Sequence, residues 1–324
     1  MRRILLSGLI LILTGCSSIN TVDARVTSND QYKAINSSLF DNKWIHGGSD
    51  CKTNTDPAIE VFRYGQASYI LRQNKCLNFE APFIYVLFGD DKVVVLDTGA
   101  TENAQEFPLY KTIKSLIEEQ STIDGKSNRE LLVIHSHSHS DHYSGDAQFE
   151  DHPNTTLVEP HSDAVTKFFI FNENSEFTLE LGGRELTIIA TPGHQEEAIS
   201  VYDSQTKWLL TGDTFYPGYV YVKNWHAYKN SIAKLASFSK ANEVSAVLGA
   251  HIEMTNTAGE YYPIGTTYQP NEASLVLMAE DLAALNIQLQ QSKEENKIIF
   301  TKFIVAPMNA FQKTLSNIAR WFTQ

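Results

Sequence analysis

Short apolar runs bounded by turn residues start near residue 59 and continue toward the end of the chain. Runs of this kind, rich in β-branched and aromatic residues, are typical of strands. The first ones are expected at residues 59–64, 68–72, 83–88 and 93–96. Between the last two, Gly89-Asp90-Asp91 predicts a hairpin turn. The folded part of the chain therefore opens with consecutive strands.

A helical spacing follows at residues 107–119, where apolar side chains recur every three or four positions: Leu109, Ile113, Leu116 and Ile117. Such spacing places them on one face of a helix. Further helices are expected at residues 163–171, 231–239, 272–289 and 310–322. Further strands are expected at residues 131–134, 156–158, 185–190, 199–202, 208–210, 244–248 and 298–305.

The order of these elements predicts an α/β (α+β) fold. Strands come first, and strands and helices then alternate in each half of the chain. This order fits two sheets packed face to face with helices on their outer faces. We assign residues 56–324 to this domain. Residues 16–55 are rich in Ser, Asn, Asp and Thr with little periodicity, so we interpret them as a tether and an irregular lead-in.

The first residues indicate export. A short basic start at residues 1–3 precedes an apolar run at residues 4–13, which matches a secretory signal and is too short to span a bilayer as a permanent helix. Leu13-Thr14-Gly15-Cys16 then resembles the lipobox of bacterial lipoproteins. The alternative is an ordinary cleaved signal followed by a chance cysteine.

The resemblance to lipoproteins implies that residues 1–15 are removed as a signal peptide and that Cys16 carries a lipid. Ser17 follows the cysteine where an Asp could stand, which by the same resemblance favours the outer membrane of a Gram-negative envelope. We therefore expect a protein that faces the periplasm and meets the membrane through its lipid anchor.

Net charge bears on which partners the protein can bind, and cysteine content bears on whether it forms a disulfide. Removing residues 1–15 takes two arginines from the 26 Lys and Arg, which leaves 24 basic and 38 acidic side chains, a formal charge of −14. A chain this acidic repels phosphate backbones, so no nucleic-acid partner is expected. With Cys16 assigned to lipid, Cys51 and Cys76 remain, and an oxidising compartment favours a disulfide between them. The alternative is two buried thiols.

A histidine-rich segment follows the strand expected at residues 131–134: His135-Ser-His137-Ser-His139-Ser-Asp141-His142. In an extended loop, residues two apart project to the same side, so His137 and His139 can reach one ion together. Asp141 and His142 diverge and can address a second ion. Imidazole and carboxylate are suitable zinc ligands. We interpret His135 as a strand-end residue, because only a motif that starts at His137 ends in Asp-His.

This string resembles the signature of the metallo-β-lactamase superfamily, and four further landmarks of that family follow in order. They are Leu96-Asp97-Thr98-Gly99, Thr191-Pro192-Gly193-His194, Thr211-Gly212-Asp213 and Gly249-Ala250-His251. The resemblance covers roughly residues 83–251, and the motifs are highly specific when they occur together.

The resemblance implies an αββα sandwich with a site for two metal ions, zinc by expectation, at one edge between the sheets. By position, the first ion would be held by His137, His139 and His194. The second would be held by Asp141, His142 and His251, and Asp213 would bridge both. In the family, the aspartate matching Asp97 supports the metal loop from outside the ligand set.

The expected chemistry is hydrolysis. Two divalent ions lower the pKa of a bridging water toward neutrality and supply hydroxide at pH 7. Asp141 is the group expected to orient that hydroxide or move its proton. Tyr216, three residues after the bridge, resembles a tyrosine that points at the substrate carbonyl in quorum-quenching lactonases. Packing alone is an equal alternative for Tyr216.

The bridging aspartate bears on the kind of hydrolase. By resemblance, Asp213 favours glyoxalase II, lactonases and related esterases over true β-lactamases, which lack an aspartate bridge. Aromatic residues at 216–225 and 261–270 suggest either a cleft for a partly apolar small molecule or loop packing. We expect hydrolysis of a small ester, lactone, thioester or amide. The alternatives are a β-lactamase, an iron-dependent oxidoreductase on the same ligands and a non-catalytic metal-binding lipoprotein.

Overall fold

The first sheet comes from the N-terminal half of the chain in the computed structural model, which describes residues 39–314 and 316. Its strands lie in chain order: β1 (Ile59–Tyr64), β2 (Ser68–Gln73), β3 (Phe83–Phe88), β4 (Lys92–Leu96), β5 (Glu130–Ile134) and β6 (Thr155–Leu157). β1 to β4 pair antiparallel, whereas β4, β5 and β6 run parallel. The predicted run of consecutive strands is therefore confirmed, and β1 and β3 have the predicted bounds.

The second sheet comes from the C-terminal half. In spatial order its strands are β13 (Val276–Leu277), β12 (Ala246–Gly249), β10 (Trp208–Gly212), β9 (Ile199–Asp203), β8 (Glu185–Ala190) and β7 (Glu176–Glu180). β10 and β12 run parallel, and α5 (Trp225–Ala241) lies within the crossover that joins them. The other neighbours are antiparallel. A smaller sheet has the order β11 (Tyr219–Val222), β15 (Ile304–Pro307) and β14 (Ile298–Ile299).

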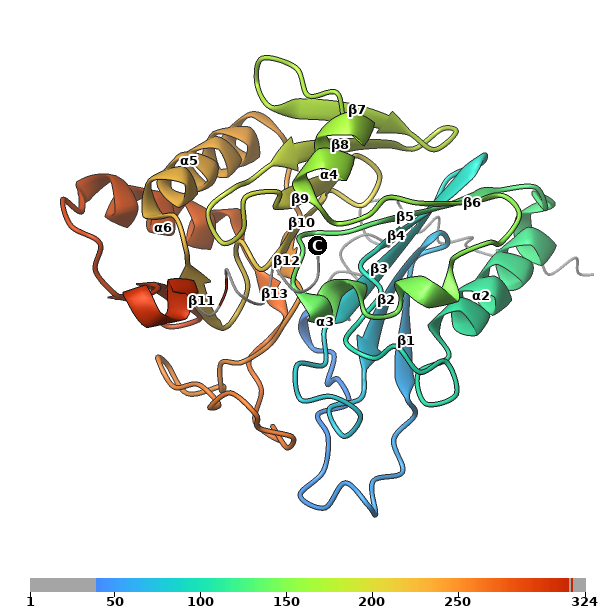
Figure 1. Ribbon diagram of the computed structural model, residues 1–324, viewed down its shortest axis with the longest axis horizontal. Helices are drawn as coiled ribbons and strands as arrows, with labels where there is room; N and C mark the ends of the chain where they lie inside the picture. The colour runs from blue at the N-terminus through green and yellow to red at the C-terminus, as the bar shows by residue number, and fades with distance from the viewer. Residues whose placement is uncertain (1–38, 315, 317–324) are drawn as a thin grey trace, which may run out of the picture.

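Three apolar clusters show how the layers pack. The inner faces of both sheets share one cluster, with Tyr85 and Leu96 from the first sheet and Trp208 and Leu248 from the second. The outer face of the first sheet packs against α2 (Leu109–Asp124), and that of the second packs against α5 and α6 (Ala279–Gln291). Figure 1 shows α2 at one side and α5 and α6 at the other, with the sheets between them. The αββα sandwich is confirmed.

Shorter helices lie in the connections: α3 (Ser140–Tyr143), the 3-10 turn η1 (Asp146–Gln148) and α4 (Ser162–Phe168). No helix within the described ranges is long and apolar enough to cross a bilayer.

Two predicted elements of the C-terminal part are wrong. The helix expected at residues 272–289 is preceded by strand β13 and starts only at Ala279. Val276 and Leu277 pair with β12, and the Asp281 carboxylate accepts a hydrogen bond from the Met278 N–H at 2.9 Å, which caps the N-terminus of the helix. The single strand expected at residues 298–305 is a hairpin of β14 and β15, closed by a hydrogen bond from the Phe300 N–H to the Phe303 carbonyl.

The aromatic segment expected as a loop at residues 216–225 contains strand β11, whose residues pair with β15. The lead-in contributes to the core, because Leu39 and Trp44 are buried in the cluster between the sheets. Cys51 and Cys76 are joined by a disulfide. The signal peptide, Cys16 and most of the tether lie outside the described residues, as does much of the helix predicted at residues 310–322.

Candidate metal centre

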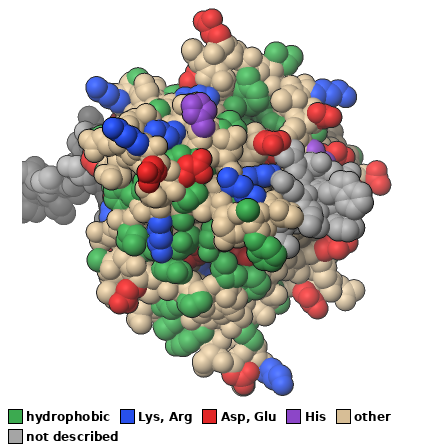
Figure 2. Space-filling model, turned by 60° about the vertical axis from the view of Figure 1, so that its left-hand side comes forward, with side chains coloured by type: hydrophobic (Ala, Val, Ile, Leu, Met, Phe, Trp, Pro, Cys, Tyr) green, Lys and Arg blue, Asp and Glu red, His purple; other side chains and the backbone are tan. Residues whose placement is uncertain are grey.

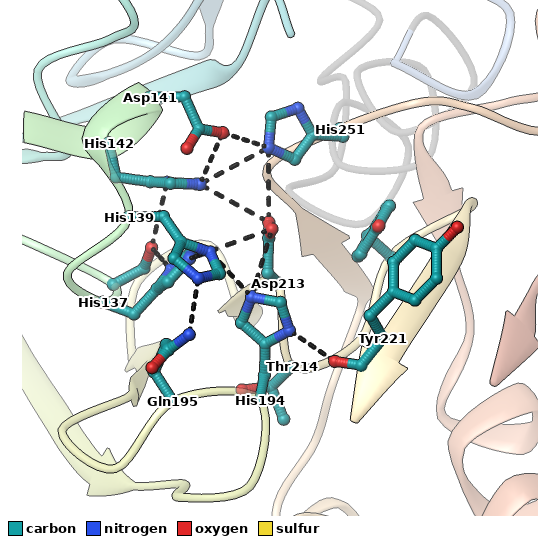
Figure 3. A network of polar contacts seen from close by, with 12 residues as sticks. His137, His139, Asp141, His142, His194, Gln195, Asp213, Thr214, Tyr221 and His251 are labelled. Atoms are coloured by element: carbon teal, nitrogen blue, oxygen red, sulfur yellow. Dashed lines mark hydrogen bonds and ion pairs between the residues drawn. The ribbon is translucent and has the colours of Figure 1, made fainter. Parts of the chain in front are cut away.

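The predicted ligands follow strands that end at the same edge of the two sheets. His137 and His139 lie in the loop after β5, and the next residue starts α3, which carries Asp141 and His142. His194 follows β8, Asp213 follows β10 and His251 follows β12. Figure 3 shows these side chains converging, although they come from segments far apart in the chain.

Close packing holds the loop that carries Asp213 against the loop that carries the histidines after β5. Gly212 has a φ of +50°, and a Cβ atom on it would lie 2.5 Å from the Cβ atom of Ser136. Only glycine fits that approach. Asp97 also has a positive φ, 72°, and its Oδ1 accepts a hydrogen bond from the Ser136 N–H at 2.7 Å. Asp97 therefore holds the histidine loop from outside the ligand cluster.

The seven side chains form two groups that share one carboxylate. Ligand atoms of the first group lie within 4.8 Å of one another: His137, His139, His194 and Asp213. The second group is equally compact: Asp141, His142 and His251. The Oδ2 atom of Asp213 is 3.7 Å from His194 Nε2, and its Oδ1 atom is 3.4 Å from His251 Nε2. Each oxygen of Asp213 thus faces a different group (Figure 3).

Each histidine has its second ring nitrogen held by a neighbour. His142 Nδ1 donates to Asp97 Oδ2 at 2.9 Å, and His194 Nδ1 donates to the Tyr221 carbonyl at 2.7 Å. His251 Nδ1 donates to the Glu80 carbonyl at 3.0 Å. The remaining two contact side chains: His137 Nδ1 lies 3.1 Å from Ser136 Oγ, and His139 Nε2 lies against the amide of Gln195. Such partners orient a histidine toward a metal and fix its tautomer.

The histidines of the first group are neutral. Burial and the neighbouring His194 together lower the pKa of His139 to about 3. Burial also holds the pKa of His137 well below its usual range and lowers that of His194. Neutral imidazole is the form that binds a metal ion.

The second group has the opposite electrostatics. Burial alone would lower the pKa of His142, but Asp141, Asp97 and Asp213 raise it well above its usual value. His251 has a pKa raised to about 9, because Asp213 and Asp141 outweigh the effect of burial. The negative potential that favours protons on these rings is the potential that attracts a divalent cation.

The donor set fits metal ions. His139 Nδ1 is 2.9 Å from His137 Nε2 and 3.1 Å from His194 Nε2. His142 and His251 both donate outward through Nδ1, so their Nε2 atoms face each other at 3.4 Å. The buried Asp213 Oδ1 has no hydrogen-bond partner among the described residues. Converging lone pairs and an unpartnered carboxylate oxygen are stable around cations.

Comparison with known proteins places this centre in a family. The family model described as the metallo-beta-lactamase superfamily matches residues 77–251, which include every residue of both groups. The chain belongs to the metallo-beta-lactamase superfamily. The membership predicted from the motifs is confirmed.

Curated relatives in this superfamily are named as hydrolases. The chain is 25% identical over 167 residues to the acyl-coenzyme A thioesterase MBLAC2 of Homo sapiens, a match covering 42% of this chain and 58% of the relative. It is 25% identical over 166 residues to a hydroxyacylglutathione hydrolase of Marinomonas sp., covering 51% of this chain and 60% of the relative. The matches thus span little more than half of these relatives' length.

Solved structures of similar proteins include a metallo-beta-lactamase from Pontibacter korlensis, with a TM-score of 0.43 and 16% identity over 72% of this chain and all of that one. The metallo-beta-lactamase TMB-1 has a TM-score of 0.47 and 15% identity, over 74% of this chain and all of that one.

The remaining predicted residues have other surroundings. His135 contacts the Val158 carbonyl and Asp146, away from the ligand groups, as expected for a strand-end residue. Tyr216 is buried at the centre, but its hydroxyl donates to the Tyr219 carbonyl at 3.0 Å and to Glu253 at 3.2 Å. Its role toward a substrate stays a prediction.

A cavity of about 280 Å³ opens onto the centre. Beside the ligands His139, Asp141, His194, Asp213 and His251, it is lined by Glu80, Tyr216, Tyr221, Glu253, Ile264, Met308 and Gln312. Sequence reasoning missed Glu80, Glu253 and Gln195 as residues of the site. Glu253 and Gln195 stand next to ligand motifs in the sequence, which is weak evidence for a place in the site. Glu80 stands near no such motif.

Proposed function

We propose that the protein is a hydrolase with two zinc ions that cleaves small thioesters and related esters. The observation that carries the proposal is the pair of ligand groups with one oxygen of Asp213 facing each. In this proposal His137, His139 and His194 would hold one ion, Asp141, His142 and His251 would hold the other, and Asp213 would contribute to both. Zinc ions bound there would activate water as a nucleophile at neutral pH and polarise the carbonyl under attack.

The protein's own residues would orient the reactants. Asp141 lies on the cavity wall, with its Oδ2 atom 3.3 Å from both His142 Nε2 and His251 Nε2. We assign it the task of orienting the attacking water and accepting its proton at the carboxylate. Tyr221 and Ile264 form an apolar part of the wall, which suits an acyl group.

The choice of thioesters rests on two supports. The names of the curated relatives, an acyl-coenzyme A thioesterase and a hydroxyacylglutathione hydrolase, both refer to thioester substrates. The position of Asp213 between the two groups supports a bridging role, which is the feature expected to separate esterases from β-lactamases. Lactones and amides are members of the same expected substrate class.

The test is a panel of neutral acyl thioesters, aryl esters, lactones and a chromogenic cephalosporin, assayed with the purified protein and its His137→Ala and His142→Ala variants. We expect thioester or ester hydrolysis that is lost on chelation, restored by zinc and reduced in both variants. Faster turnover of the cephalosporin than of any ester would favour the β-lactamase. Iron in place of zinc, with visible absorption of the purified protein, would favour the oxidoreductase.

We further propose that a lipid on Cys16 anchors the protein to the outer membrane, where it faces the periplasm. Labelled palmitate should enter the unmutated protein and not Cys16→Ala. Absence of label from the unmutated protein would contradict the anchor.

We propose a small-molecule substrate and no nucleic-acid partner. The excess of acidic over basic side chains supports this proposal. On the face shown in Figure 2, Lys and Arg are interspersed with Asp and Glu and do not form a continuous basic stripe of the kind that binds nucleic acid.

A further inference from the structure

Glu80 brings an additional carboxylate to the cavity. It lies in the loop between β2 and β3, and its side chain lines the cavity next to Asp141 and His251. Its backbone carbonyl accepts the hydrogen bond from His251 Nδ1 at 3.0 Å, which fixes the loop at the edge of the ligand cluster. The position of Glu80 is therefore tied to the second metal group.

The other carboxylates on the cavity wall already have partners. Asp141 and Asp213 face the histidines of the two groups. The Oε2 atom of Glu253 accepts hydrogen bonds from the Tyr219 N–H at 2.7 Å and from the Tyr216 hydroxyl at 3.2 Å. By contrast, no described residue forms a hydrogen bond or an ion pair with the Glu80 carboxylate. Its carboxyl oxygens can therefore contact a bound molecule.

Basic side chains do not contribute to the described wall of this cavity. Among the described residues that line it, none is Lys or Arg. Lys75 belongs to the same loop as Glu80 and attracts its charge, but its buried ammonium group donates to the Phe79 carbonyl at 2.8 Å and does not line the cavity. Two divalent ions would carry as many positive charges as the wall has carboxylates, namely Asp141, Asp213, Glu80 and Glu253. The loaded cavity thus has no excess of positive charge to attract an anion.

We propose that Glu80 determines substrate specificity: it admits acyl groups that are neutral or cationic beside the scissile carbonyl and rejects those that carry a carboxylate there. This inference rests on the proposed hydrolase function and narrows its substrate class. A second negative charge next to Glu80 would meet a carboxylate in a partly desolvated cavity, where charge repulsion is strong.

Three small thiols test this proposal, because they have nearly equal size and thiolates bind zinc directly. Cysteamine is cationic, 2-mercaptoethanol is neutral and mercaptoacetate is anionic. Dissociation constants would be measured by calorimetry at pH 8 on the zinc-loaded protein, on Glu80→Gln and on Glu118→Gln, a control at an exposed position of α2. Each probe is compared with itself across variants, so differences in thiol acidity cancel.

We expect Glu80→Gln to bind mercaptoacetate about tenfold more tightly and cysteamine more weakly than the parent, with 2-mercaptoethanol unchanged. Glu80→Asp should keep the parent's order, and Glu118→Gln should match the parent for all three probes. The same Glu80→Gln variant should hydrolyse monoanionic succinyl thioesters about tenfold faster relative to neutral butyryl thioesters.

Two other outcomes are distinguishable. If Glu80→Gln keeps two zinc ions but the three thiols retain the parent's affinities, the role of Glu80 is wrong and the hydrolase proposal stands. If the parent binds neither zinc nor thiols and hydrolyses no thioester, the proposed function is wrong and the specificity proposal fails with it. If Glu80→Gln loses metal, Glu80→Ala and Glu80→Ser take its place in the same measurements. These two variants must then bind mercaptoacetate more tightly than the parent, and unchanged affinity in both would overturn the proposal.

Discussion

The two halves of the metal centre differ in charge although the segment after β5 contributes two residues to each. The first group adds three histidines to Asp213, and burial lowers the pKa of each histidine. The second group adds Asp141, and the carboxylates around it raise the pKa of both of its histidines. Two sites a few residues apart in sequence thus have opposite affinities for protons.

The difference comes from the carboxylates near each ring, because Asp141 and Asp213 raise the pKa of both histidines of the second group. The first group is held by neutral partners, which are Ser136, Gln195 and the Tyr221 carbonyl. In the second group, the Asp97 carboxylate holds His142. The first site is therefore ready for a metal ion at neutral pH, whereas the second must release protons before it can bind one.

The largest effect is expected for Asp213→Ala, because Asp213 is the only residue that faces both groups within the described part of the chain. Neither ion would then keep its full ligand set. We expect zinc content to fall below two ions and turnover to drop by at least about 10³-fold. Zinc analysis and kcat on a neutral thioester check this prediction. Two retained ions with near-normal turnover would show that the bridge is wrongly assigned.

Changing the supporting residues should separate the halves. Asp97→Asn should weaken the second ion by about 10- to 100-fold and the first ion much less. Gln195→Leu should weaken binding of the first ion more than binding of the second, because Gln195 contacts His139 of the first group. Competition titrations with a chromogenic chelator measure both affinities. Equal losses at both sites in either variant would mean that the two halves are not held separately.

The pH dependence should also differ between the ions. A histidine with a raised pKa is protonated at neutral pH without metal, so binding releases its proton and affinity rises with pH up to that pKa. For His251 this limit is about 9. The second ion should lose about tenfold in affinity per pH unit below pH 9 for each proton released. The first ion should be nearly insensitive between pH 6 and 9, because the pKa of His139 is about 3.

The smallest effect is expected for Tyr216→Phe. The hydroxyl of Tyr216 already donates to the Tyr219 carbonyl and contacts Glu253, so its removal should lower kcat less than about tenfold and leave zinc content intact. A loss of two or more orders of magnitude in kcat with unchanged KM would instead support a direct contact with the reacting carbonyl.

The sequence predicted the ligands better than the cavity wall. His194 and Asp213 could be located because each stands in a short motif directly after an apolar strand, and the strands end at one edge. Glu80 could not, because its loop reaches the site through the packing of one sheet against the other, shown by the hydrogen bond from His251 to its carbonyl. No local pattern encodes that contact.

The mistaken elements have a similar cause. Val276 and Leu277 continue the apolar spacing of the helix that follows, so only their pairing with β12 shows them to be a strand. Residues 298–305 are apolar at both ends, and the polar Thr301-Lys302 between them marks the hairpin turn that the prediction overlooked. Strand β11 was hidden by Pro217 and Gly218, which are typical of loops.

Calorimetric titration of the chelator-stripped protein with zinc tests the central claim most directly. Run at pH 7.5 in buffers of different ionisation enthalpy, it counts both the ions bound and the protons released at each step. We predict two ions in two steps, with proton release confined almost entirely to the second, weaker one. A single step, one ion in total, or proton release in the first step would contradict two electrostatically different halves joined by Asp213.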